Sequence, residues 1–244
     1  MSLLKGLTSD ASIAPERDSV GGGGVLESGL YNSTISLAYL TKSAGGAVGL
    51  VLQAKTDKGR DLRQTLWMTS GTAKGGNNYY VDKDGQKQYL PGYNLANSLS
   101  LLAAGKEINE LETETKVVNV YSYEAKAEVP TKVEMITELL GKEIIVGVIK
   151  QVVDKTAKND AGVYMPTGET REENEVDKFF RARDRMTTAE IRAQVDEATF
   201  IDSWDAKWAG KVRERAKGAA NGMAGIVGAP KGAATKKPTT SLFA

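Results

Sequence analysis

Apolar and polar side chains alternate with a period of two in three successive segments, 31–41, 48–55 and 62–69. Such alternation is typical of β-strands that bury one face. The residues expected on the core face are Tyr31, Ile35, Leu37, Tyr39, Val48, Leu50, Leu52, Ala54, Leu62, Leu66 and Met68. Short polar or glycine-containing turns separate the segments, so the pattern predicts an antiparallel meander of three strands.

A small hairpin and a helix are expected next. Two short β-forming segments, 79–81 and 87–90, flank Asp84-Gly85, a dipeptide typical of tight hairpin turns. Residues 93–104 carry leucines at helical spacing and are followed by Gly105, a common helix stop.

Further strands are expected in the second half of the chain. Residues 117–123 and 143–154 are strongly β-forming, and the stretch 170–180 is a candidate to pair back on the second of them. Apolar residues at helical intervals between 133 and 140 predict a short helix after Pro130.

The C-terminal part has helical and then low-complexity patterns. Thr187 and Glu190 form a capping box that opens a helix, and three aromatic residues follow at helical spacing between Phe200 and Trp208. Residues 218–244 are rich in Gly and Ala with scattered Lys and Pro, which predicts a disordered tail.

Three strands, a helix and further strands follow one another in the order of an OB-fold, a small Greek-key barrel. We therefore expect a mainly β protein, namely an OB-fold-like five-stranded antiparallel barrel with C-terminal helices appended. The expected parts are an irregular N-terminal arm (1–28), an OB-fold domain (29–180), a C-terminal helical extension (181–217) and a disordered basic Gly/Ala-rich tail (218–244).

The chain contains neither cysteine nor histidine. Disulfides, thiolate metal sites and every catalytic arrangement that uses histidine are thereby excluded, so we expect no enzyme, no catalytic residue and no cofactor. Acidic residues between 172 and 177 could hold a metal on one strand face, but a solvated charged face is favoured, and we expect no metal. Without a signal peptide or a membrane span, a cytoplasmic location is expected.

Charge is unevenly placed along the chain. Residues 206–244 hold eight basic residues and one acidic residue, a net charge of +7, whereas the rest holds 24 basic and 30 acidic residues, a net charge of −6. Such a basic end is compatible with a polyanion contact and equally with a solvated tail.

The third segment carries the most specific candidate chemistry, because Arg63 and Trp67 share the face opposite its apolar residues. Aromatic stacking on bases combined with phosphate contacts from Lys and Arg gives sequence-tolerant binding to single strands. The candidate nucleic-acid-binding residues are Lys55, Arg63, Trp67, Lys74, Tyr79, Tyr80, Lys87 and Tyr89. In the alternative interpretation Trp67 covers a second small core and Tyr79 packs on Tyr89 across the hairpin.

Five stretches together carry a family resemblance: residues 71–80 (GTAKGGNNYY), 89–93 (YLPGY), 139–142 (LLGK), 174–180 (NEVDKFF) and 208–217. In their order, the chain resembles the single-stranded DNA-binding proteins of tailed bacteriophages that have one OB-fold and a helical C-terminal extension. The resemblance implies sequence-independent binding of single-stranded DNA in phage replication or recombination, in the host cytoplasm. The basic tail departs from the acidic tail with which many such proteins recruit partners.

Single-stranded DNA is therefore the expected partner. Duplex DNA and phage replication proteins are further candidates, no membrane partner is expected, and the oligomeric state is left open. Two alternatives belong to other classes: a structural or assembly protein of a virion that uses the β-domain for protein contacts, and a carboxylate-metal nuclease.

Overall fold

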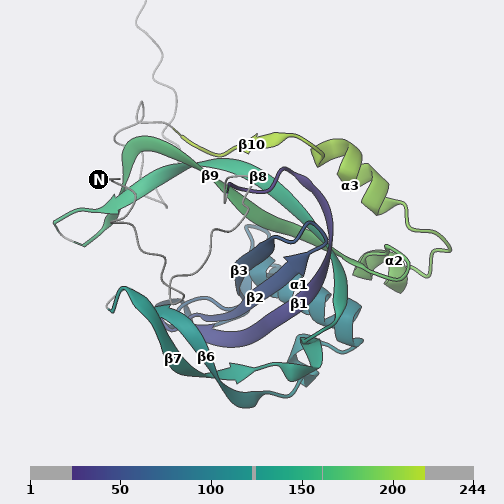
Figure 1. Ribbon diagram of the computed structural model, residues 1–244, viewed down its shortest axis with the longest axis horizontal. Coiled ribbons are helices and arrows are strands. Elements are labelled where there is room, and N and C mark those ends of the chain that lie inside the picture. The colour runs from purple at the N-terminus through teal and green to yellow at the C-terminus, as the bar shows by residue number, and fades with distance from the viewer. Residues whose placement is uncertain (1–23, 123–124, 161, 218–244) are drawn as a thin grey trace, which may run out of the picture.

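Strand β1 (Gly29–Lys42) holds the sheet together because three other strands pair with it. It runs antiparallel to β2 (Val48–Thr56) from Ser33 onward, to β8 (Glu143–Lys158) through its first half, and to β7 (Ala127–Met135) near its end. The computed structural model (Figure 1) describes residues 24–122, 125–160 and 162–217. The other strands are β3 (Asp61–Trp67), β4 (Tyr79–Val81), β5 (Lys87–Tyr89), β6 (Glu114–Ser122), β9 (Tyr164–Arg181) and β10 (Val212–Glu214), and the helices are α1 (Pro91–Ala104), α2 (Thr188–Arg192) and α3 (Phe200–Trp208), with 3-10 turns η2 (Thr72–Lys74), η3 (Ile108–Glu110) and η4 (Thr137–Leu139).

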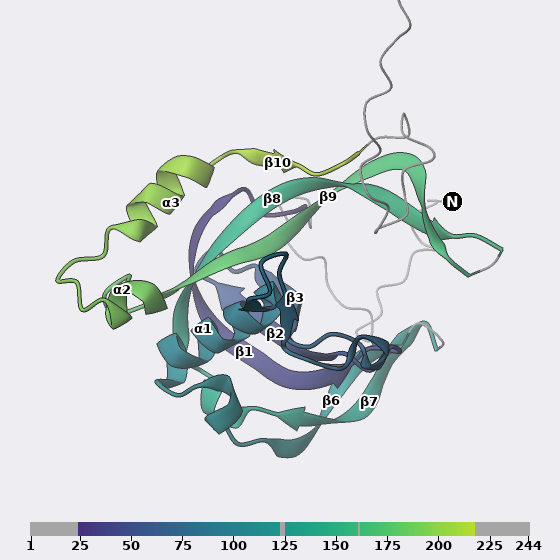
Figure 2. The same cartoon turned by 180° about the vertical axis from the view of Figure 1, so that it is seen from behind.

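The described strands form one eight-stranded sheet and a separate hairpin, β4–β5. The path β10-β8-β1-β2-β3 runs through the sheet, with β7 and β6 branching from β1 and with β9 branching from β8. Figures 1 and 2 show the β6–β7 and β8–β9 ribbons on opposite sides of β1–β2–β3, with their free ends projecting toward the same side. The expected mainly β architecture with few helices is confirmed.

The sheet is open, because β3 and β9 share no backbone ladder among the described residues. Gln64, on the core side of β3, instead accepts a hydrogen bond from the backbone N–H of Val176 on β9 at 2.6 Å. This side-chain hydrogen bond bridges the two strands where the five-stranded antiparallel barrel expected from the sequence would close.

A β-bulge in β1 reverses the facing of its second half. The pairing with β2 shifts between Ile35 and Leu37. Before the shift Tyr31 and Ile35 enter the main core, but after it Ala38 does so, while Leu37 and Tyr39 point to the opposite side. The expectation that Tyr31, Ile35, Leu37 and Tyr39 share one face is therefore wrong, because one extra residue inverts the two-residue alternation.

Strand β8 is covered on both faces, which explains its continuous apolar run Ile144–Ile149. The even-numbered residues of this run enter the main core, whereas Ile145 and Ile149 pack with Trp204 of α3. Strands buried on both faces have continuous rather than alternating apolar residues. Gly147 lies directly beneath the Trp204 indole, since a Cβ at Gly147 would come within 2.9 Å of the ring.

The expectation of a short helix after Pro130 is wrong. Residues 127–135 form strand β7, and only the 3-10 turn η4 follows. Val129, Thr131 and Val133 also alternate at the period of a strand, and here the strand pattern prevails because β7 pairs with β6 along its whole length. Pro130 is tolerated because β7 reaches β1 only at residues 134 and 135, which leaves an open edge at the proline.

The C-terminal extension packs on the outside of β8 and β9. Trp204 Nε1 donates a hydrogen bond to Asp177 at 2.8 Å, and the Arg213 guanidinium donates one to the side chain of Gln151 at 2.7 Å. Strand β10 adds a parallel pairing with β8, so the extension is not purely helical. Asp177 belongs to the acidic stretch of β9 and Gln151 to β8. No group of acidic residues within the described ranges is arranged to hold a metal ion.

Other expectations concern the ends of the chain. The tail (218–244) and residues 1–23 of the N-terminal arm lie outside the described residues. The remainder of the arm is tied to β9, because the backbone N–H and carbonyl of Leu26 both hydrogen-bond to the Asn174 side chain at 2.7 Å. In the part of the chain that the structure describes, no helix combines the length and the apolar character needed to cross a membrane.

One carboxylate caps two helices in the extension. Glu190 accepts a hydrogen bond from the Thr187 N–H at 2.8 Å and donates its own N–H to the Thr187 side chain at 3.2 Å, which confirms the capping box. Its second oxygen accepts from the N–H groups of Thr199 and Phe200, each at 2.8 Å, where α3 begins. Burial alone would raise the pKa of Glu190, but these hydrogen bonds outweigh burial and lower the pKa to about 2.

We expect Glu190→Gln to lower the melting temperature near neutral pH. Because the folded-state pKa of about 2 lies below the ordinary glutamate value of ~4.3, the carboxylate stabilises the fold fully above that ordinary value and loses its effect as pH falls through the folded-state pKa. Thermal unfolding across this range measures the effect, with Glu197→Gln in the exposed loop as control. A difference from wild type that persisted unchanged at the lowest pH would contradict the assignment.

Candidate nucleic-acid interface

The side of the β1–β2–β3 sheet that faces away from the main core, which we call the outer face, carries the predicted cation–aromatic pair. Along β3, Leu62 and Leu66 are buried in the main core. Arg63 and Trp67 alternate with them and are exposed, with 43% of the Trp67 surface open to solvent. The structure therefore places both side chains off the main core, as the two-residue period predicts.

The Trp67 ring packs directly over a glycine of the neighbouring strand. Its cross-strand partner in β2 is Gly49, where a Cβ would lie 2.8 Å from the Trp67 ring and 2.9 Å from the Thr65 methyl group. At the start of α1, a Cβ on Gly92 would lie 2.1 Å from the Trp67 carbonyl oxygen. One glycine thus makes room for the indole and the other for its backbone, so the exposed ring is held in place by its surroundings.

Arg63 is oriented by a buried tyrosine. Its Nη2 donates a hydrogen bond to the Tyr39 hydroxyl at 3.0 Å, and Tyr39 is only 3% exposed. The tyrosine ring packs in a small apolar cluster with Val51, Val133 and Met135. A second small core therefore does exist on the outer face, as the alternative interpretation proposed, but it is built around Tyr39 and not around Trp67.

The hairpin β4–β5 presents tyrosines with a cation. The register pairs Tyr79 with Tyr89 on one face of the hairpin. Lys87, on the same face, places its Nζ 4.6 Å from the centre of the Tyr79 ring, and the Tyr89 ring lies 4.7 Å from that of Tyr93 in α1. Tyr80 projects from the other face and is half exposed.

The hairpin tip is a closed turn rather than an ion-binding loop. The Asp82 carboxylate accepts hydrogen bonds from the backbone N–H groups of Gln86 and Asp84, at 2.9 and 3.0 Å, and from the Gln88 side chain at 3.2 Å. The hydrogen bond from Gln86 is the largest cause of the lowered pKa of Asp82. The carboxylate thus serves to hold the turn in shape.

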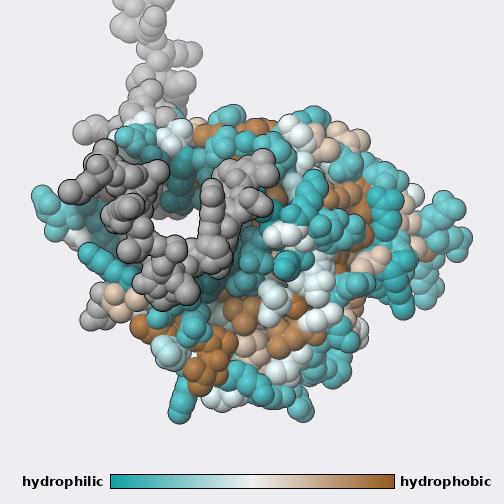
Figure 3. Space-filling model, in the orientation of Figure 1, coloured by the Kyte–Doolittle hydropathy of each residue, from teal (hydrophilic) through white to brown (hydrophobic). Residues whose placement is uncertain are grey.

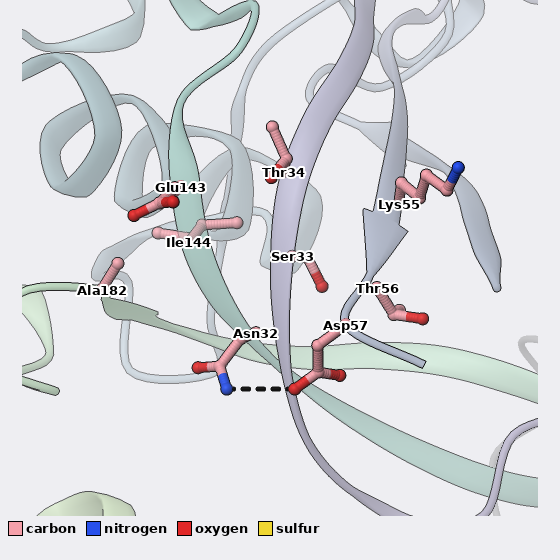
Figure 4. A pocket seen from close by; sticks show the side chains of 9 residues that line it. All are labelled: Asn32, Ser33, Thr34, Lys55, Thr56, Asp57, Glu143, Ile144 and Ala182. Carbon is pink, nitrogen blue, oxygen red and sulfur yellow. Dashed lines mark hydrogen bonds between the residues drawn. The ribbon is translucent and has the colours of Figure 1, made fainter. Parts of the chain in front are cut away.

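Two of the predicted residues, Lys55 and Lys74, belong to elements other than β3. Lys55 is six residues along β2 from the partner of Trp67, about 20 Å at the rise of a strand. Lys55 lies beside a shallow polar depression, in which the Asn32 amide donates to Asp57 at 3.1 Å (Figure 4). Lys74 is exposed on the turn η2. Lys55 is thus far from Trp67, but it is only two residues along β2 from Gln53, the partner of Arg63, so on the outer face Arg63 lies between Trp67 and Lys55.

The sequence analysis did not identify Tyr39 as part of the outer face, nor the position of the β6–β7 arm beside that face. Tyr39 was assigned to the main core because the bulge in β1 leaves no clear mark in the residue pattern. Val118 and Val120 of β6 pack beside the Tyr39 cluster, so the β6–β7 arm flanks the outer face. The alternating valines of these strands were the available signal, but they do not say which sheet face the arm covers.

Comparison with models of protein families and with curated proteins finds no match to this chain.

We expect Gly49→Val to displace the Trp67 ring, because the new side chain would occupy the space of the indole. Tryptophan fluorescence should shift. The free energy of oligonucleotide binding should weaken by ~1–3 kcal/mol, which is the contribution of stacking on one base. Gly24→Val is the control, because nothing lies within 4 Å of a Cβ at that position. Gly59 is equally open, but its positive φ would strain a valine, so it is not a suitable control. Unchanged fluorescence and affinity in Gly49→Val would contradict the seating of Trp67.

Proposed function

We propose that this protein binds single-stranded DNA without sequence preference through the outer face of β1–β2–β3. The observation that carries the proposal is the exposed indole of Trp67, fixed over Gly49 and accompanied on the same strand by Arg63. Only unpaired bases offer their faces to such a ring, so stacking favours single strands and tolerates every base. The guanidinium would meet the phosphates of the same strand.

The surroundings of this pair favour the proposal. The hydrogen bond to Tyr39 leaves the other nitrogen atoms of Arg63 available to a phosphate, and Tyr39 itself is fixed in its apolar cluster. The tyrosines of β4–β5 begin twelve residues beyond Trp67 and would supply further stacking surfaces, with Lys87 as a second cation. Side chains fixed before binding lose less conformational entropy when DNA is bound.

The wider assignment is part of the same proposal. An OB-type arrangement is supported by the meander β1–β2–β3, the helix that follows it and the return of β9 toward β3 through Gln64. The family resemblance of the sequence adds a role in phage DNA replication or recombination. In this proposal the protein binds DNA without modifying it and acts in the cytoplasm of the host.

We expect Trp67→Ala to weaken oligonucleotide binding by ~1–3 kcal/mol with little change in stability. The reason is that its ring is half exposed, so truncation leaves no large cavity. Trp204→Ala is the matched control: its indole is 3% exposed and packs on β8, so it should cost ~3–5 kcal/mol of folding free energy and leave the outer face unchanged. Thermal unfolding and fluorescence titration of the same samples separate the two effects. Oligonucleotide binding by Trp67→Ala with unchanged affinity would contradict the stacking role of Trp67.

We expect affinity to fall with salt, and Arg63→Gln to reduce the slope of log affinity against log salt by about 0.7, the value for one phosphate contact on a single strand. Trp67→Ala should lower affinity without changing this slope, because stacking releases no counterions. Lys132→Gln, exposed on β7, is the control for loss of one positive charge. If the full-length wild-type chain bound neither single-stranded nor duplex DNA at low salt, the virion-assembly alternative would be favoured.

A further inference from the structure

Two adjoining depressions form a trough across one end of the sheet. The first, of about 400 Å³, is the polar depression beside Lys55, and the second, of about 440 Å³, lies between the last turn of α1 and the turn that follows β9. Glu143 and Ala182 line both depressions, so the two are continuous. Each has the volume of a small-ligand site, ~300–1,000 Å³.

Strand pairing sets the floor of the trough. Lys55 of β2 pairs with Thr34 of β1, which pairs on its other side with Glu143 of β8. Arg181, the last residue of β9, pairs one residue farther along β8, so Ala182 comes beside Glu143. Figure 4 shows Thr34 between Glu143 and Lys55. At the spacing of neighbouring strands, Lys55 and Ala182 are three strands apart, about 14 Å.

Each end of the trough has an exposed cation. Lys55 is exposed at one end. At the other, the turn 181–185 carries three arginines and one aspartate, a net charge of +2, and Figure 3 shows mainly hydrophilic residues at this α2 end of the molecule. Arg181 donates two hydrogen bonds to Asp184, whereas the Arg183 Nε lies 3.6 Å from that carboxylate and its side chain is 75% exposed. Arg183, which lines the trough, is therefore available to an anion.

We propose that the trough continues the path of the DNA, so that a strand bound at Trp67 runs on past Arg63 and Lys55 to a phosphate contact with Arg183. This inference rests on the proposed function of the outer face. Arg63 lies between Trp67 and Lys55 on that face, so the cations follow one another along a single path into the trough. A groove whose cations follow the nucleic-acid backbone is typical of proteins that bind single strands without sequence preference.

The floor of the trough fits bases better than phosphates. Glu143 is exposed between the two cations, and its carboxylate would repel a phosphate placed directly above it. A carboxylate can instead accept hydrogen bonds from the amino groups of cytosine, adenine and guanine. The phosphates would therefore lie over the two ends of the trough and the bases over its floor. No aromatic side chain is among the residues that line the trough, so it adds polar contacts and no stacking.

The test measures the affinity of the full-length chain for labelled oligodeoxycytidines of about 4 to about 16 nucleotides, the range of site sizes for one OB-fold. The shortest should occupy the Trp67 end, where the stacking surface lies, and the longest should also reach Arg183. Arg183→Gln should therefore keep wild-type affinity for the shortest oligonucleotides. It should bind the longest more weakly, with the slope of log affinity against log salt reduced by about 0.7, the value for one phosphate contact.

Arg171→Gln is the matched control. Arg171 is also exposed and ion-paired, to Glu173 at 3.0 Å, but it lies ten residues before Arg181 on β9, about 33 Å along the strand. This variant should have wild-type affinity and slope at every length. Arg183→Glu, which adds repulsion, should weaken the binding of long oligonucleotides further than Arg183→Gln does.

The outcomes separate this inference from the proposed function. A wild-type chain that bound no oligonucleotide of any length would overturn the proposed function, and the trough with it. If Trp67→Ala weakened the binding of the shortest oligonucleotides but Arg183→Gln matched wild type at every length, only the role of the trough would be overturned. The same holds if Arg183→Gln weakened short and long oligonucleotides equally, because the effect would then not depend on the longer path.

Discussion

One extra residue in β1 determines how the two faces of the sheet are used. Because the pairing with β2 shifts between Ile35 and Leu37, the first half of β1 builds the main core and the second half sends Tyr39 to the outer face. A regular strand of this length would have kept both sets on one side. The bulge therefore lets a single strand complete the main core at one end and form the Tyr39 cluster, against which β6 and β7 pack, at the other.

The candidate interface is a consequence of that second cluster. Tyr39 is held by its apolar neighbours and in turn orients Arg63, while Gly49 provides the space in which Trp67 lies. Arg63 is thus positioned by the buried side chain of Tyr39, and Trp67 by the backbone of Gly49. Such support is what keeps a binding surface in a defined geometry before the ligand arrives.

Charge is distributed differently from what the sequence totals suggest. Part of the basic excess near the C-terminus is already engaged, since Arg213 and Arg215 both pair with Glu175 of β9. Likewise Lys150 pairs with Glu172 at 3.2 Å, so the acidic stretch of β9 is matched by cations of the same chain. The ion pairs of Arg213 and Arg215 help to attach the C-terminal extension to β9, and they leave fewer of its cations for contact with a polyanion.

The sequence by itself determined the local elements: the meander 29–69, the helix before Gly105, the capping box of Thr187 and the exposed side of Trp67. All of these follow from short-range periodicity and capping, which neighbouring residues encode. Only the tertiary structure decided the bulge in β1, the strand at Pro130 and the open edge between β3 and β9. Each of these features depends on the pairing of strands that are distant in the sequence. Residue periodicity describes only local structure and does not determine that pairing.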